Sequence, residues 1–224
     1  MTRYRVEKIV VLAIDYQIFS KNSDHILDEI PDKKKIIPFI SIHPMTKNKR
    51  YLLESYIDKG AKGVKVHPPM QLSIPTHHGY YELYELCEEY NLPILFHTGH
   101  SPLTPPFLSK YTRAYDFEKV VKDFPNNVFI FGHAGGVDTY IELAYIAQNN
   151  KNVYMEIGSQ PPDHIRQIID IVGSRRVLYG SDWPYYPMGM QIAKVLIATE
   201  GKPLLRKRIL YSNAKRLMKK FQMI

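Results

Sequence analysis

Residues 92–99 read LPILFHTG and residues 128–136 read VFIFGHAGG, and these two stretches decide the fold. Each is a run of apolar residues that ends in a histidine and is followed by glycine. Apolar residues at consecutive positions, rather than at alternating ones, are typical of parallel strands buried on both faces. We therefore expect two buried parallel strands, each of which places a histidine at or next to its carboxyl end.

The same pattern recurs along the chain and alternates with segments of helical character. The apolar runs are residues 8–14, 36–42, 63–67, 92–97, 127–133, 152–157 and 176–182. The helical segments are residues 51–59, 80–90, 116–124, 138–148, 163–172 and 212–221. Such alternation predicts a parallel α/β fold with right-handed crossovers, either an open sheet or a closed barrel. No glycine fingerprint follows the first run, so a dinucleotide-binding sheet is unsupported. No linker and no repeat interrupts the pattern, which predicts a single domain over residues 1–224.

Composition narrows the function classes. The chain has 224 residues, of which 45% are hydrophobic, and 30 Lys and Arg against 22 Asp and Glu give a net charge of +8. The basic residues are scattered apart from Lys33–Lys35 and the C-terminal end, so we expect no nucleic-acid partner. No apolar run approaches the roughly 20 residues that cross a bilayer, and the N-terminus lacks a signal-peptide pattern, so we expect a cytoplasmic protein without membrane contact. The single cysteine, Cys87, excludes an internal disulfide framework.

Ionisable side chains close every apolar run. They are Asp15, His43, His67, His97, His133, Glu156 and Asp182. In a parallel barrel these positions surround the carboxyl-end opening, where active sites are built. Neutral imidazole is a common zinc ligand, and a carboxylate can both bind metal and accept a proton. We therefore expect His97, His133 and Asp182 to bind a divalent metal, and Glu156 to orient a neighbouring histidine.

Further residues near these strand ends are candidates for contact with a small-molecule substrate. Lys65 and His67 share one face of their strand, so both can point inward, and His67 either contacts substrate or fixes the loop. His100 follows the His97 loop and either binds substrate or lies on the surface. Arg113 suits carboxylate binding as well as a surface position. Trp183 follows Asp182 and either forms a wall of the pocket or serves ordinary packing.

The chain resembles the amidohydrolase superfamily, in particular the amidohydrolase-related group that includes carboxymuconate-semialdehyde decarboxylase-like enzymes. The specific segments are GVKVHPPMQ (63–71), FHTG (96–99), GHAGG (132–136) and GSDWP (180–184), and the resemblance extends in order over nearly the whole chain. It implies a TIM-like (β/α)8 barrel of the metal-dependent hydrolase type. It also implies that His97 is a metal ligand and that Asp182 binds or faces the metal and handles protons. His133 is implied as a ligand or as a group that polarises the substrate and the metal-bound water.

One departure from the family pattern matters. The first strand of the family carries a His-x-His pair that binds the metal, and this sequence has no such pair. Its first run, KIVVLAID, resembles the second strand of the family, so we expect about seven parallel strands with the usual first strand missing. Weak or absent metal binding follows, and the gap predicts a homo-oligomer or an N-terminal segment folded over the gap.

These observations predict a metal-dependent hydrolase that acts on a small amide, ester or lactone through a metal-bound water. Asp182 would take and return the proton, and His133 would stabilise the developing negative charge. Zinc is the expected ion, although His and Asp ligands also suit manganese, iron or cobalt. The alternatives are a decarboxylase of a small carboxylic acid at the same site, or a catalytically degenerate or partner-completed barrel.

Overall fold

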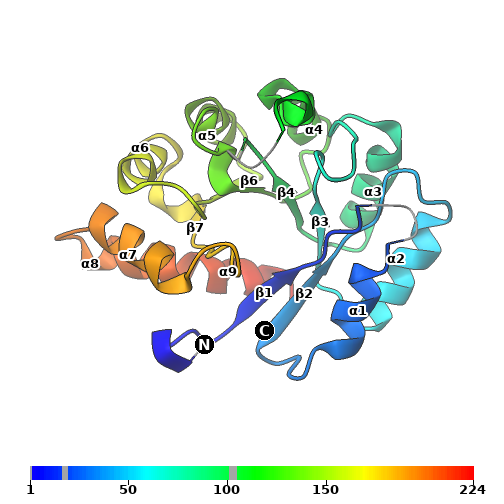
Figure 1. Ribbon diagram of the computed structural model, residues 1–224, viewed down its shortest axis with the longest axis horizontal. Coiled ribbons are helices and arrows are strands. Elements are labelled where there is room, and N and C mark those ends of the chain that lie inside the picture. The colour runs from blue at the N-terminus through cyan, green and yellow to red at the C-terminus, as the bar shows by residue number, and fades with distance from the viewer. Residues whose placement is uncertain (1, 17–19, 101–104) are drawn as a thin grey trace.

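The computed structural model describes residues 2–16, 20–100 and 105–224. The seven apolar runs form one sheet in which every neighbouring pair is parallel, in the order β1 to β7. The strands are β1 (Ile9–Leu12), β2 (Ile36–Ile40), β3 (Gly63–Val66), β4 (Ile94–His97), β5 (Phe129–Gly132), β6 (Val153–Glu156) and β7 (Val177–Leu178). The sheet curls into part of a TIM barrel with helices on its outer side, which confirms the predicted fold class and the seven strands (Figure 1).

Helices connect the strands as parallel topology requires. They are α1 (Asn22–Glu29), α2 (Lys49–Asp58), α3 (His78–Glu89), α4 (Ala114–Asp123), α5 (Tyr140–Asn149), α6 (Pro162–Val172), α7 (Met188–Ala198), α8 (Pro203–Lys207) and α9 (Asn213–Lys220). Short turns of helix occupy Thr2–Tyr4, Pro106–Tyr111, His133–Gly135, Ser174–Arg176 and Arg208–Ser212. The six predicted helices are confirmed, whereas α1, α7 and α8 were not predicted. Within the described ranges, every helix is too short or too polar to cross a bilayer.

Aromatic side chains fill the layer between the sheet and the outer helices. The rings of Phe96 and Phe129 stack with centroids 5.6 Å apart, and the ring of Phe117 from α4 meets Phe96 at 5.2 Å. All three side chains are fully buried. The consecutive apolar positions of β4 and β5 are therefore explained by burial on both faces, as the sequence pattern predicts.

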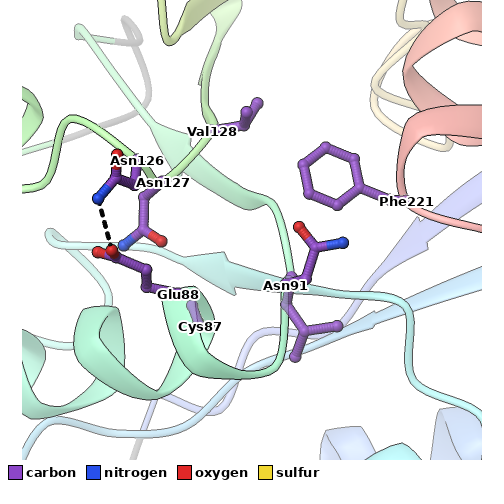
Figure 2. A pocket seen from close by; sticks show the side chains of 8 residues that line it. Cys87, Glu88, Asn91, Asn126, Asn127, Val128 and Phe221 are labelled. Atoms are coloured by element: carbon purple, nitrogen blue, oxygen red, sulfur yellow. Dashed lines mark hydrogen bonds between the residues drawn. The ribbon is translucent and has the colours of Figure 1, made fainter.

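The inner face of the sheet carries a second apolar layer, which we call the floor cluster. Its buried members are Ile37, Phe39, Leu95, Val128, Ile130, Leu178, Leu217 and Phe221. Leu217 and Phe221 come from α9 and its end, so this helix packs against the inner side of the curled sheet. A hollow of about 20 Å³ lies beside Phe221, between Asn91 and Asn127 (Figure 2).

The sheet has two free edges. Over the described residues β1 pairs only with β2, and β7 pairs only with β6. The segment before β1 reaches across to the β7 side, because the Tyr4 hydroxyl lies 2.7 Å from where a side chain on Gly189 would begin. This N-terminal segment thus lies against the start of α7.

Candidate active site

Five consecutive strands deliver a cluster of ionisable side chains to the carboxyl-end opening of the sheet. We call it the mouth cluster, and it consists of Lys65, His67, His97, His133, Glu156 and Asp182. Lys65 is 3% exposed, whereas the other five are half-buried and border on solvent. The parallel register brings these residues together, although they span more than half of the sequence.

The three histidines of the mouth cluster touch through their rings. The His67 and His97 rings stack with centroids 3.9 Å apart and an interplanar angle of 12°. The His133 ring meets His97 edge-on at 4.7 Å and 68°. Burial lowers the pKa of His67 and His97 well below the usual value, and it lowers the pKa of His133 to about 4. All three imidazoles are therefore neutral at pH 7, the form that binds metal.

Lys65 supplies the positive charge of the cluster. Burial lowers its pKa to about 8, while the carboxylates of Glu156 and Asp182 oppose that shift. Among the described residues its ammonium has no hydrogen bond and no carboxylate within 4.0 Å. Burial also raises the pKa of Asp182, which brings this carboxylate closer to the range in which it can accept and return a proton.

The backbone at His133 and Asp182 is unusual. Both residues have left-handed φ angles, 61° and 53°, which cost energy for residues with a side chain. The loop after β5 also approaches the loop after β4 closely. A side chain at Gly99 would start 2.0 Å from the carbonyl carbon of Gly135, so only glycine fits there. Two residues with left-handed backbone therefore lie at the same opening of the sheet.

Glu156 contacts the neighbouring His133, as predicted, but it bonds to the backbone of this residue and not to its imidazole. The Oε2 of Glu156 accepts a hydrogen bond from the backbone N–H of His133 at 3.0 Å. Thr98 and Gln160, which sequence reasoning missed, also bond to the loop that carries His133. The available signals were a polar residue directly after β4, in FHT, and one four residues after β6, in IGSQ, but polar residues occur in most loops.

Three predicted substrate residues lie farther out. His100 faces Asp138, whose Oδ2 lies 3.6 Å from its Nδ1. Arg113 is 3.0 Å from the buried carboxylate of Asp116 at the start of α4. Trp183 is 71% exposed at the opening.

Two strand-end residues serve the fold instead of the cluster. Asp15 is 4% exposed and its carboxylate accepts hydrogen bonds from Ser20, Asn22 and Ser23, so it holds the start of α1. His43 accepts a hydrogen bond at Nδ1 from the backbone N–H of Met45 at 3.2 Å, which fixes its loop.

The chemistry of the donors fits a divalent metal better than their arrangement does. The imidazoles are neutral, and Nδ1 of His133 is buried and has no hydrogen-bond partner among the described residues, which leaves it available as a ligand atom. Yet no three His, Cys, Asp or Glu side chains of residues 2–16, 20–100 and 105–224 are placed to hold one ion together. The stacked rings of His67 and His97 lie face to face rather than aiming their nitrogens at one point.

Solved structures with the same fold include enzymes and one protein of unassigned activity. An uncharacterised TIM-barrel protein from Bordetella bronchiseptica matches 96% of this chain and 79% of its own, with 21% identity and a TM-score of 0.79. A 5-carboxyvanillate decarboxylase from Novosphingobium aromaticivorans, complexed with manganese, matches 96% and 76%, with 16% identity and a TM-score of 0.72. A protein from Pseudomonas putida that is assigned as a 2-pyrone-4,6-dicarboxylic acid hydrolase matches 97% and 82%, with 15% identity and a TM-score of 0.68. At these identities the likeness concerns the fold.

Family membership comes from the sequence. No curated protein matches the chain significantly. The model of the amidohydrolase family matches residues 19–219, which contain the whole mouth cluster. The chain therefore belongs to the amidohydrolase family.

Proposed function

We propose that the chain is a metal-dependent hydrolase that acts on a small amide, ester or lactone at the mouth cluster. The observation that carries this proposal is the meeting of three neutral histidines, a buried lysine and two carboxylates at one opening. Family membership and the fold neighbours support it. A divalent metal, when bound, would polarise the scissile carbonyl and activate water.

The residues of the chain take separate roles in this proposal. His97, His133 and Asp182 would hold the metal, which requires side-chain movement from the arrangement described above. Asp182 would accept the proton of the attacking water and return it to the leaving group, for which its raised pKa is suited. As the alternative to ligating the metal, His133, neutral at pH 7, would donate a hydrogen bond to the oxygen on which negative charge develops.

Lys65 and the outer residues would bind the substrate. The ammonium of Lys65 lacks a carboxylate partner within 4.0 Å in the described part of the chain, so it can take an anionic group of the ligand. His67 would donate a hydrogen bond to the substrate next to Lys65. Its Nδ1 accepts the Met70 N–H, so the neutral ring carries its proton on Nε2. His100, Arg113 and Trp183 would form the outer wall.

Decarboxylation of a small carboxylic acid is the second candidate. Two observations favour it: structural neighbours named as decarboxylases, and a buried ammonium without a carboxylate partner among the described residues, which could receive the carboxylate of such a substrate. Release of CO2 from an aromatic acid, without uptake of water, would separate this reaction from hydrolysis of a lactone or ester.

Metal content tests the proposal first. We expect elemental mass spectrometry to find close to one zinc or manganese per chain in the wild-type protein after both are offered. His97→Ala and Asp182→Asn should each remove it, because the ligand set has no spare member. His25→Ala, on the exposed side of α1, is the matched control. A folded wild-type protein without metal would contradict the proposal and favour a degenerate or partner-completed barrel.

The free edges of β1 and β7 bear on assembly. Each edge presents unpaired backbone groups, which favour pairing with another chain. We propose a homo-oligomer, and light scattering after size-exclusion chromatography should give a mass above that of one chain. A monomer at every concentration would contradict the proposed homo-oligomer.

A further inference from the structure

The loop that carries His133 has a conformation that its own sequence does not favour. Four consecutive residues have left-handed φ angles: His133 at 61°, Ala134 at 46°, Gly135 at 92° and Gly136 at 64°. Glycine adopts such angles freely, but His133 and Ala134 do so only where surrounding contacts determine the backbone. The position of the His133 imidazole therefore depends on residues outside the loop.

Gln160 holds this loop at both ends. Its side-chain Nε2 donates to the carbonyl of His133 at 2.7 Å and to the carbonyl of Gly136 at 2.6 Å. Gln160 follows β6 and is 1% exposed, so water does not compete for these bonds. One amide group thus fixes the distance between the first and last residues of the left-handed run.

The orientation of the Gln160 amide is itself determined. Its Oε1 lies 2.9 Å from Nδ1 of His164, and the His164 ring stacks on Tyr140 with centroids 3.7 Å apart. The two carbonyls on one side and the ring nitrogen on the other leave a single consistent assignment of the amide oxygen and nitrogen.

Glu156 fixes the same loop from the strand side. One carboxylate oxygen accepts the His133 N–H at 3.0 Å, and the other accepts the N–H of Gly158 at 2.5 Å. The carboxylate fills space that only glycine leaves open, because a side chain at Gly180 would begin 2.0 Å from Oε1. Both oxygens are thus engaged by the backbone, which suits a fixed support and not a group that carries protons.

We propose that Gln160, together with Glu156, is a positioning residue that clamps the left-handed loop and thereby sets the place of the His133 imidazole in the site. The inference rests on the proposed function, since it assumes that His133 acts there. Gln160 touches neither the imidazole nor the opening in this arrangement. It acts through the two carbonyls, so its removal should displace His133 while the rest of the fold persists.

The test compares Gln160→Met with the wild-type protein by NMR of histidine side chains, in protein treated with a chelator. Methionine keeps the length and volume but cannot donate to either carbonyl. We expect the His133 imidazole signal to shift and broaden, whereas those of His25 and His78, far from the loop, stay in place. The matched control is Gln148→Ala, which removes a glutamine that donates to the Ile171 carbonyl at the exposed end of α5. An unchanged His133 signal in folded Gln160→Met would overturn the proposal.

Two further arms keep the test decisive. If Gln160→Met does not fold, Gln160→Asn is used, because it retains the amide but is one methylene too short to reach both carbonyls. The same displacement of the His133 signal is expected. An unchanged His133 signal in this variant would equally contradict the clamp. Where a substrate is turned over, Gln160→Met should lower kcat by about 100-fold and change KM much less, as a misplaced catalytic group does. A wild-type protein without metal or turnover would reject the proposed function, whereas the NMR comparison would still decide on the clamp.

Discussion

The mouth cluster and the floor cluster belong to the same seven-stranded sheet and differ in almost every physical property. The floor cluster is apolar, closely packed and covered by α9, with a hollow of only about 20 Å³ beside it (Figure 2). Apart from the buried Lys65, the mouth cluster is half-buried; it is ionisable and strained at His133 and Asp182, and Nδ1 of His133 has no partner within the described part of the chain. Stability is therefore built at one end of the strands, and chemistry can be performed at the other.

This difference explains how a strained and partly unsatisfied site persists. Left-handed residues and buried polar atoms without partners each destabilise a fold, and they survive where other regions supply the stability. Substitutions in the two clusters should therefore have opposite profiles. Floor substitutions should lower the free energy of unfolding and leave ligand binding intact. Mouth substitutions should impair ligand binding and change the free energy of unfolding much less.

The largest effect is expected for Phe39→Ala in the floor cluster. Phe39 is 2% exposed, and its ring occupies the space above Gly63, so truncation leaves a cavity that the backbone cannot close. We expect the free energy of unfolding to fall by about 3–5 kcal/mol, measured by urea denaturation. Metal content in the variant that remains folded should match the wild type.

Tyr51→Ala provides the matched control, because Tyr51 is an aromatic residue of α2 that is 75% exposed. Its loss should change the stability by less than about 0.5 kcal/mol. Similar losses of unfolding free energy in Phe39→Ala and Tyr51→Ala would contradict this comparison, since the floor cluster would then contribute no more to stability than the surface does.

The sequence predicted the strands well because they follow from a local pattern. Runs of apolar residues predicted all seven strands, and five of the seven residues that close these runs meet at the opening, whereas Asp15 and His43 do not. The helix α7 was missed because its apolar residues lie on several faces: Leu196 is 40% and Ile197 is 55% exposed, so there is no amphipathic period to read. Helix α1 is eight residues long with only Ser23 and Leu27 buried, too short for a pattern.

The details of the site could not be read from the sequence, for a different reason. Whether imidazoles converge on one point depends on rotamers, and the bonds of Gln160 depend on a left-handed loop 24 to 27 residues earlier. Glycine at 135 and 136 permits such a loop, but nothing in the local sequence indicates that His133 and Ala134 adopt it too.

The next effect concerns pH and should be confined to the mouth. The pKa of His133 is about 4 in the folded chain and about 6.5 in an unfolded one. Between these values the unfolded chain binds a proton that the folded chain does not, so acidification favours unfolding and stability rises with pH. His133→Asn removes this contribution of up to about 3 kcal/mol.

The contribution of His133 to the pH dependence of stability is measured by urea denaturation of chelator-treated protein at pH 7 and pH 4.5. The wild type should lose more stability than His133→Asn over this interval, whereas Phe39→Ala should lose as much as the wild type from a lower starting point. The carboxyl groups of Asp15, Glu156 and Asp182 have raised pKa values, so they make stability fall as the pH rises. Their contribution is the same in each variant and cancels in the comparison. Equal losses in wild type and His133→Asn would mean that His133 is not held neutral at the mouth.

The smallest effect on stability is expected for Arg113, and this residue tests how far the substrate-binding region extends from the mouth cluster. Arg113 lies on a loop at the opening, but its guanidinium is 59% exposed and pairs with Asp116 at 3.0 Å. Arg113→Met should lower stability by about 1 kcal/mol, because the buried Asp116 loses its cation but keeps the hydrogen bond from Thr76. Lys122→Met, which breaks an exposed pair with Glu118 on α4, should lower it by about 0–1 kcal/mol. If the mouth reaches Arg113, the variant should also raise KM for a carboxylate substrate, and Lys122→Met should not. A KM equal to that of the wild type would confine substrate recognition to Lys65 and its neighbours, and the guanidinium would then serve only to neutralise the buried Asp116.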